Sequence, residues 1–171
     1  MVTPTSTPGP THGPSQGPTL RTERALLRAG AISVACLDEV GRGALSGPVT
    51  LGAVLITPDS VPAPSGVRDS KLLTATQREA LRPLVVEWAS AWALPRVVTM
   101  VKADQRCSGV AAASILAKTA RDRIMIKLHE GYPEYGWAQN KGYGSSEHLK
   151  ALARLGPTPH HRMTWSLPAG P

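Results

Sequence analysis

An apolar run over residues 31–37 ends abruptly in two neighbouring carboxylates, Asp38 and Glu39. Glycines flank the arginine of the turn that follows, Gly41-Arg42-Gly43, and a second apolar run covers residues 48–56. This order predicts a strand, a turn and a second strand. Carboxylates at a buried strand end are costly to desolvate unless a positive charge lies beside them. A magnesium or manganese ion would supply that charge. A solvated strand end with an ion pair to Arg42 is the alternative.

The charge of the chain is unevenly distributed along its 171 residues, a length that fits one domain. Lys and Arg number 19 against 12 Asp and Glu, a formal net charge of +7. From Arg96 onward there are 11 basic and 5 acidic side chains. A basic C-terminal half favours a polyanionic partner, nucleic acid first. A general solubility charge is the alternative.

The other bulk features exclude several classes of protein. Cys36 and Cys107 lack the spacing of a metal site, and Cys36 lies in an apolar run typical of a buried, reduced thiol. No apolar segment is long enough to cross a membrane, and the N-terminus lacks the pattern of a secretory signal. We therefore expect a cytoplasmic protein without a membrane partner, and a monomer.

Composition divides the chain into a tail and a domain. Residues 1–20 are almost entirely Pro, Thr, Gly and Ser, without a charged side chain. Such a segment buries too little apolar surface to offset its chain entropy, which predicts a disordered tail. We expect a single domain over residues 21–167 and a short C-terminal tail over 168–171.

Several local signals place the remaining elements. Thr74 and Gln77 form a capping box that opens a helix, and Pro83 should kink or interrupt that helix. Residues 84–94 fit either a helix or a strand, and residues 97–101 are β-branched and predict a strand. Two further helices are expected, one capped by Ser108 and starting near Val110, and one over 145–155 with Gly156 beyond its end.

The long helix that follows Ser108 carries a polar stripe. Ser114, Lys118 and Asp122 recur every four residues, so they share one face. A carboxylate and an ammonium on one face could meet a common ligand. The alternative, an ordinary i,i+4 ion pair on a solvated face, is the more common outcome of such spacing alone.

Five motifs in this order together resemble type 2 ribonuclease H, the bacterial ribonuclease HII family. They are Asp38-Glu39-Val40-Gly41-Arg42-Gly43 with Ser46-Gly47-Pro48-Val49; Asp69-Ser70-Lys71-Leu72; Ala111 to Lys118 with Arg121-Asp122-Arg123; Tyr135-Gly136 with Asn140-Lys141-Gly142-Tyr143-Gly144; and His148 with His161-Arg162. The resemblance covers roughly residues 21–167. It implies an α/β fold with a ribonuclease H-like mixed sheet and flanking helices.

The resemblance also implies an activity and its residues. The family is a cytoplasmic, Mg²⁺- or Mn²⁺-dependent endonuclease that cuts the RNA of RNA–DNA hybrids, on the 5′ side of ribonucleotides embedded in duplex DNA. Metal and catalytic roles would fall on Asp38, Glu39 and Asp122. Contacts with the nucleic acid would fall on Gly41, Arg42, Gly43, Lys71, Lys141, Tyr143 and Arg162, with Tyr143 stacking on the sugar at the RNA–DNA junction.

Two points complicate this metal site. Neighbouring strand residues point to opposite faces, so Asp38 and Glu39 share an ion only if the strand breaks at Val40-Gly41. The family's third Asp, at the end of a later strand, has no counterpart, because several tens of residues are missing between Leu94 and Val97. We therefore expect the sheet to lack one central strand and one helix. Asp104 is a further candidate ligand if residues 97–103 move into the vacant position beside the first strand.

The shortening leaves two alternatives to an active nuclease. One is a catalytically impaired remnant that binds hybrids because the third metal-ligand Asp is missing. The other is a chain that forms no stable protein, because the loss of a strand leaves its neighbours unpaired.

Overall fold

The computed structural model describes residues 17–88 and 102–168. Their elements, in chain order, are α1 (Arg21–Arg28), β1 (Val34–Val40), β2 (Thr50–Ile56), the 3-10 turn η1 (Ser70–Leu72), α2 (Ala75–Trp88), α3 (Ala103–Arg106), α4 (Ser108–Gly131), the 3-10 turn η2 (Pro133–Tyr135), α5 (Trp137–Asn140) and α6 (Ser146–Leu155). The predicted hairpin and the last helix are confirmed within a few residues. The predicted strand 97–101 and most of the predicted tail lie outside the described residues.

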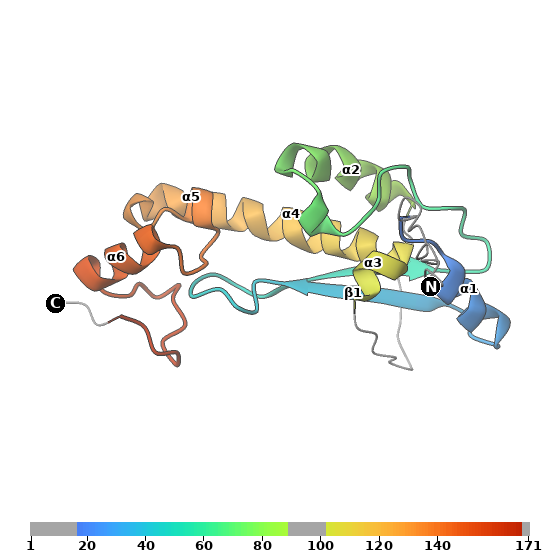
Figure 1. The fold of residues 1–171 in the computed structure, drawn as a ribbon, viewed down its shortest axis with the longest axis horizontal. Coiled ribbons are helices and arrows are strands. Elements are labelled where there is room, and N and C mark those ends of the chain that lie inside the picture. The colour runs from blue at the N-terminus through green and yellow to red at the C-terminus, as the bar shows by residue number, and fades with distance from the viewer. Residues whose placement is uncertain (1–16, 89–101, 169–171) are drawn as a thin grey trace, which may run out of the picture.

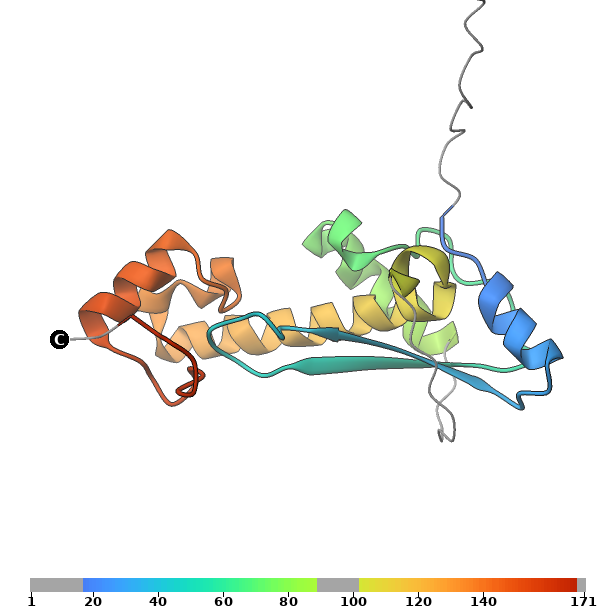
Figure 2. The same cartoon turned by 60° about the horizontal axis from the view of Figure 1, so that its bottom comes forward.

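Helix α4 is the axis of the molecule (Figure 1). Its 24 residues span roughly 36 Å at 1.5 Å per residue. The antiparallel pair of β1 and β2 runs along one side of α4, and α2 packs on another. Figure 2 shows α1 near one end of the hairpin and α5 and α6 at the opposite end of α4. The α/β class is confirmed, and within the described residues the sheet has these two strands.

Small residues let α4 lie close to the sheet. A Cβ on Gly52 of β2 would stand 2.0 Å from the carbonyl oxygen of Ala113, and one on Gly109 would stand 2.4 Å from Sγ of Cys36. The helix surface over the strands is a run of buried alanines, 111–113. Val54 and Ile56 complete this apolar layer, which forms the main core between helix and hairpin.

A second core lies at the C-terminal end of α4. Met125 packs there with Tyr135, Trp137 and Leu152, all of them buried. The rings of Tyr135 and Trp137 stack with their centroids 5.3 Å apart. This core fixes η2, α5 and α6 on α4, and it supports the loop that carries Tyr143.

Three sequence-based expectations need correction. Pro83 does not interrupt α2, because Leu81 and Val85 on either side of it are buried against the core. Ser108 does not cap α4: Cys107 is the N-cap residue, and the Ser108 hydroxyl donates to the Pro18 carbonyl instead.

The third correction concerns the domain boundary. Leu20 is buried, and Thr19 forms a parallel bridge with Cys107. Ordered contacts therefore begin before the predicted boundary at Arg21.

The capping box of α2 is confirmed, since the backbone N–H groups of Thr74 and Gln77 donate to each other's side chains at 2.8 and 3.2 Å.

Candidate active site and nucleic-acid interface

Asp38 and Glu39 lie on opposite faces of the hairpin. Asp38 pairs with Gly52, on the face that α4 covers, whereas Glu39 pairs with Leu51 and is exposed. Strand β1 continues to Val40, so the break that would turn both carboxylates to one side occurs only after the strand has ended. The structure does not bring these two side chains together.

Asp104 lies close enough to Asp38 to affect its ionisation. Burial raises the pKa of Asp38, and the negative charges of Asp104 and Glu39 raise it further. The pKa of Asp104 is itself raised by burial and by the neighbouring Asp69. Lys71 approaches this group, with Nζ 3.9 Å from Oδ2 of Asp104. Asp38, Asp69 and Asp104 thus form an acidic neighbourhood with one lysine beside it.

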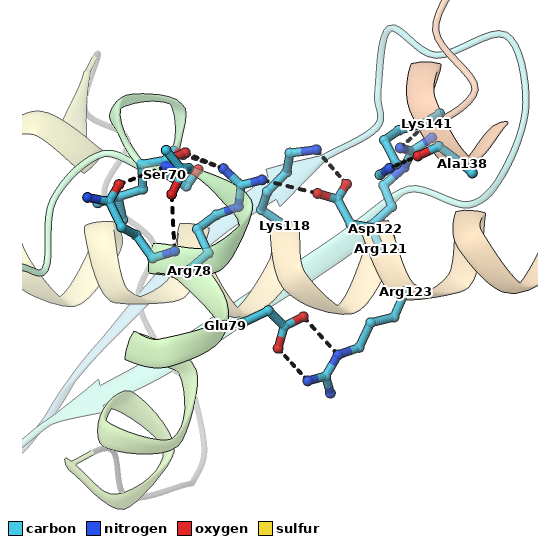
Figure 3. Close-up of polar contacts among 12 residues, drawn as sticks. Ser70, Arg78, Glu79, Lys118, Arg121, Asp122, Arg123, Ala138 and Lys141 are labelled. Atoms are coloured by element: carbon cyan, nitrogen blue, oxygen red, sulfur yellow. Dashed lines mark hydrogen bonds and ion pairs between the residues drawn. The ribbon is translucent and has the colours of Figure 1, made fainter. Parts of the chain in front are cut away.

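Asp122 is neutralised by two cations (Figure 3). Its Oδ1 lies 2.5 Å from Nζ of Lys118, and its Oδ2 lies 3.3 Å from an Nη of Arg78. The predicted i,i+4 ion pair is therefore present on α4. Lys141 is a third nearby cation: burial lowers its pKa, the charge of Asp122 opposes that shift, and the charges of Lys118 and Arg78 add to it. Three cations around one carboxylate make this surface attractive to a phosphate.

The residues do not assemble a metal site in this arrangement. Among residues 17–88 and 102–168, no three His, Cys, Asp or Glu side chains come together closely enough to hold an ion. Glu39 faces away from α4, and both carboxylate oxygens of Asp122 are engaged by cations. The predicted ligand set of Asp38, Glu39 and Asp122, with Asp104 as a further candidate, remains a prediction.

Arg162 holds the turn after β1 from the far end of the chain. One Nη of Arg162 donates to the carbonyl of Gly41 at 2.5 Å, and the other donates to the carbonyl of Arg42. Arg42 and Gly43 project from this turn and are exposed. Two predicted nucleic-acid contacts, which are 120 residues apart in the sequence, therefore meet at one turn.

The loop that carries Lys141 and Tyr143 lies against the segment that follows this turn. The backbone N–H of Leu45 donates to the carbonyl of Gly142 at 2.8 Å, which holds the 140–143 loop against the segment after β1. Tyr143 is 38% exposed, so one part of its ring is free to stack on a ligand. Lys71 stands apart from this group, with its exposed side chain near Asp104.

Arg121 is the residue that organises this interface. It is fully buried, and its guanidinium donates to the carbonyls of Ser46, Pro48 and Lys141 at 2.7–3.0 Å. It also lies over the Tyr143 ring, 5.4 Å from the centroid. Burial lowers its pKa. Sequence reasoning missed this role, because its partners are 20 to 75 residues away and its only local signal is the motif it shares with Asp122.

None of the helices in the described ranges has the length and apolar character that a bilayer-crossing helix requires.

Sequence comparisons identify a family. The family model described as Ribonuclease HII matches residues 35–95 and 88–167. Among the similar proteins, Ribonuclease HII of Rhodopseudomonas palustris (strain TIE-1) is 40% identical over 84% of this chain and 66% of its own length. Ribonuclease HII of Cereibacter sphaeroides (strain ATCC 17029 / ATH 2.4.9) is 39% identical over 84% of this chain and 88% of its own length. The chain therefore spans somewhat less than two thirds of the Rhodopseudomonas relative.

These alignments extend over 189 residues, more than the 171 residues of the whole chain. The relatives accordingly carry residues for which this chain has no counterpart, and the family model matches in two pieces that meet at residues 88–95.

Solved structures agree on the fold. Ribonuclease H2 of Pyrococcus horikoshii OT3 matches with a TM-score of 0.59 and 25% identity, over 78% of this chain and 94% of that chain. The ribonuclease HII in a PCNA complex from Archaeoglobus fulgidus matches with a TM-score of 0.62 and 23% identity, over 77% of this chain and 92% of that one. On its family match, its identity to these relatives and its fold, the chain belongs to the ribonuclease HII family.

Proposed function

We propose that this chain is an endonuclease that hydrolyses the RNA strand of RNA–DNA hybrids and cuts on the 5′ side of ribonucleotides embedded in duplex DNA. The observation that carries the proposal is that Arg162 bonds to the Gly41-Arg42-Gly43 turn, while the loop that carries Lys141 and Tyr143 is bonded through Gly142 to Leu45, just after that turn. An exposed ring beside exposed backbone suits recognition of a sugar edge, where a 2′-hydroxyl distinguishes RNA from DNA.

Electrostatics support the same substrate. The formal net charge is +7, and Arg78, Lys118 and Lys141 surround the single carboxylate of Asp122. Exposed Lys71 adds a fourth cation on the Asp104 side. These four cations, at separate places on the surface, could each contact a different phosphate of a duplex.

Within the proposal, Mg²⁺ or Mn²⁺ is the cofactor, and Asp38, Glu39 and Asp122 are the catalytic carboxylates, with Asp104 as a further candidate ligand. An ion at Asp122 would have to displace Arg78 and Lys118 from its oxygens. A cytoplasmic location and a monomeric state belong to the same proposal.

The test uses the full chain with a labelled DNA duplex that contains one ribonucleotide, in the presence of Mn²⁺. We expect a cut 5′ to the ribonucleotide, no cut in the all-DNA duplex, and no cut by the Asp38→Asn variant. Binding of the duplex without any cut would instead identify a hybrid-binding remnant. If the chain neither binds nor cuts the duplex, the proposal is overturned.

A further inference from the structure

Two separate C-terminal segments hold the residue 41–47 turn region. On one side, the N–H groups of Leu45 and Ser46 donate to the Gly142 carbonyl at 2.8 and 3.2 Å. On the other side, the N–H of Arg162 donates to the Leu45 carbonyl at 2.9 Å. The position of the Gly41-Arg42-Gly43 turn therefore depends on how these two segments, the Tyr143 segment and the Arg162 segment, stand relative to each other.

A pair of buried histidines joins the two segments. Nε2 of His148 lies 3.0 Å from Nε2 of His161. The other ring nitrogen of His148 lies 2.9 Å from the Tyr143 carbonyl, and the other ring nitrogen of His161 lies 2.9 Å from the backbone nitrogen of Thr158. His148 is fully buried and His161 is 5% exposed, so water cannot substitute for these contacts.

The partners at the outer ends of the pair fix its protons. A carbonyl only accepts, so Nδ1 of His148 carries a proton. Its Nε2 faces the indole N–H of Trp137, which only donates, so Nε2 is an acceptor. A backbone N–H only donates, so Nδ1 of His161 is an acceptor and its Nε2 carries the proton. The Nε2–H of His161 then donates to His148, which also accepts from Trp137 Nε1 at 3.3 Å. Every contact is satisfied only when both rings are neutral.

The surroundings keep the rings neutral. The titratable groups packed against them are the phenol of Tyr135 on η2, which donates to the Gly156 carbonyl, and His160 on the loop that follows α6. The charged residues beside His148 on its own helix, Glu147 and Lys150, are exposed. Burial lowers the pKa of His148, and burial together with the charge of His148 lowers the pKa of His161 to about 4.

We propose that His148 and His161 act as positioning residues, a neutral hydrogen-bonded pair that holds Tyr143 and Arg162 in the relative position in which both contact the nucleic acid. The role rests on the proposed function, since it concerns the same interface. The histidines themselves are buried, so they act through these two residues and do not touch the substrate.

The test compares three variants of the full chain on the duplex with one ribonucleotide at pH 7. His161→Leu removes the donor to His148, and we expect KM to rise about tenfold with kcat within about twofold of wild type. His161→Gln keeps an N–H donor in reach of His148 and should bring KM back to within about threefold of wild type. Lys150→Gln, at an exposed position of α6, is the control and should leave KM unchanged.

An unchanged KM in His161→Leu, or equal KM values in the Leu and Gln variants, would overturn the proposal. If the variants do not fold, the wild-type chain decides through the NMR shifts of its histidine ring nitrogens. The expected result is a proton on Nδ1 of His148 and on Nε2 of His161 at pH 7, and any other tautomers or a charged ring overturn the pair. A wild-type chain that shows this pattern but neither binds nor cuts the duplex refutes the proposed function and the positioning role, and leaves the neutral pair standing.

Discussion

Gly41 and Arg121 lie so close together that a Cβ at position 41 would stand 2.0 Å from Nε of the arginine. Gly41 also has a φ of +90°, which side chains other than glycine rarely adopt. The turn after β1 thus rests directly on a buried guanidinium, and that guanidinium contacts the Tyr143 ring. The two sides of the proposed interface are linked through one arginine.

Replacement of Gly41 by Ala should destabilise the protein by about 3 kcal/mol, because a strained φ and a clash with Arg121 add together. Urea unfolding measures the change. Gly43→Ala is the matched control, since a Cβ at position 43 meets nothing within 4 Å and its φ is ordinary. Equal stabilities of the two variants would mean that Gly41 does not rest on Arg121 as described.

Replacement of Arg121 by Met should cost at least about 3 kcal/mol, because it leaves the carbonyls of Ser46, Pro48 and Lys141 without their buried donor. The neighbouring Arg123→Met is the control. Arg123 forms an exposed ion pair with Glu79, and such pairs contribute less than about 1 kcal/mol. Thermal and urea unfolding of both variants would show whether the loss is specific to position 121.

Local patterns predicted the elements of this fold better than its long-range contacts. The hairpin, the capping box at Thr74 and the last helix depend on residues within a few positions, and all three are present. The continuity of α2 through Pro83 depends on tertiary burial of its neighbours. The burial of Glu23 also depends on a long-range contact. Its carboxylate accepts from the N–H of Gly109, which lies 86 positions away at the start of α4.

The site shows the same division. The spacing of Lys118 and Asp122 predicted their ion pair, whereas the bond from Arg78 to Asp122 spans 44 positions and has no local signal. The pairing of His148 with His161 likewise depends on how α6 and the following loop fold back onto each other. The opposite directions of Asp38 and Glu39 did follow from strand geometry alone.

The stability of the protein should fall in mild acid through His161. Burial, with the charge of His148 as a second cause, lowers the pKa of His161 from 6.5 to about 4. The folded state thus binds a proton less readily than the unfolded chain, so this contribution is complete above pH 6.5 and is lost as the pH falls toward 4. Between pH 7 and pH 5 we expect wild type to lose about 2 kcal/mol more than His161→Gln. Urea unfolding at each pH measures the two free energies of unfolding. If they fall by the same amount between pH 7 and pH 5, this contribution is excluded.

Metal affinity should depend on Asp104. Its charge raises the pKa of Asp38, which means that a cation near Asp38 would interact with both carboxylates. We expect Asp104→Asn to weaken Mn²⁺ binding about tenfold in titration calorimetry, as the loss of one ligand or near neighbour does. Asp59→Asn, a change of one exposed carboxylate, is the control. Equal affinities of the two variants would remove Asp104 from the candidate ligands.

Hybrid binding should depend on salt through identifiable lysines. The Lys71 side chain is 82% exposed and lies beside the acidic group of Asp38 and Asp104, so its ammonium is open to a backbone phosphate. A lysine that neutralises one phosphate adds about one unit to the slope of log K against log salt concentration. We therefore expect Lys71→Gln to reduce that slope by about one, and to weaken binding equally for duplexes of different sequence.

Lys150→Gln, at an exposed position of α6 on which no proposed contact depends, should leave the slope unchanged. Fluorescence anisotropy with a labelled hybrid over 50–300 mM salt measures both slopes. The slope reflects the number of lysines and arginines that contact the phosphate backbone. An unchanged slope in the Lys71 variant, or a smaller slope in the Lys150 variant, would therefore mean that the phosphates do not bind at Lys71 as proposed.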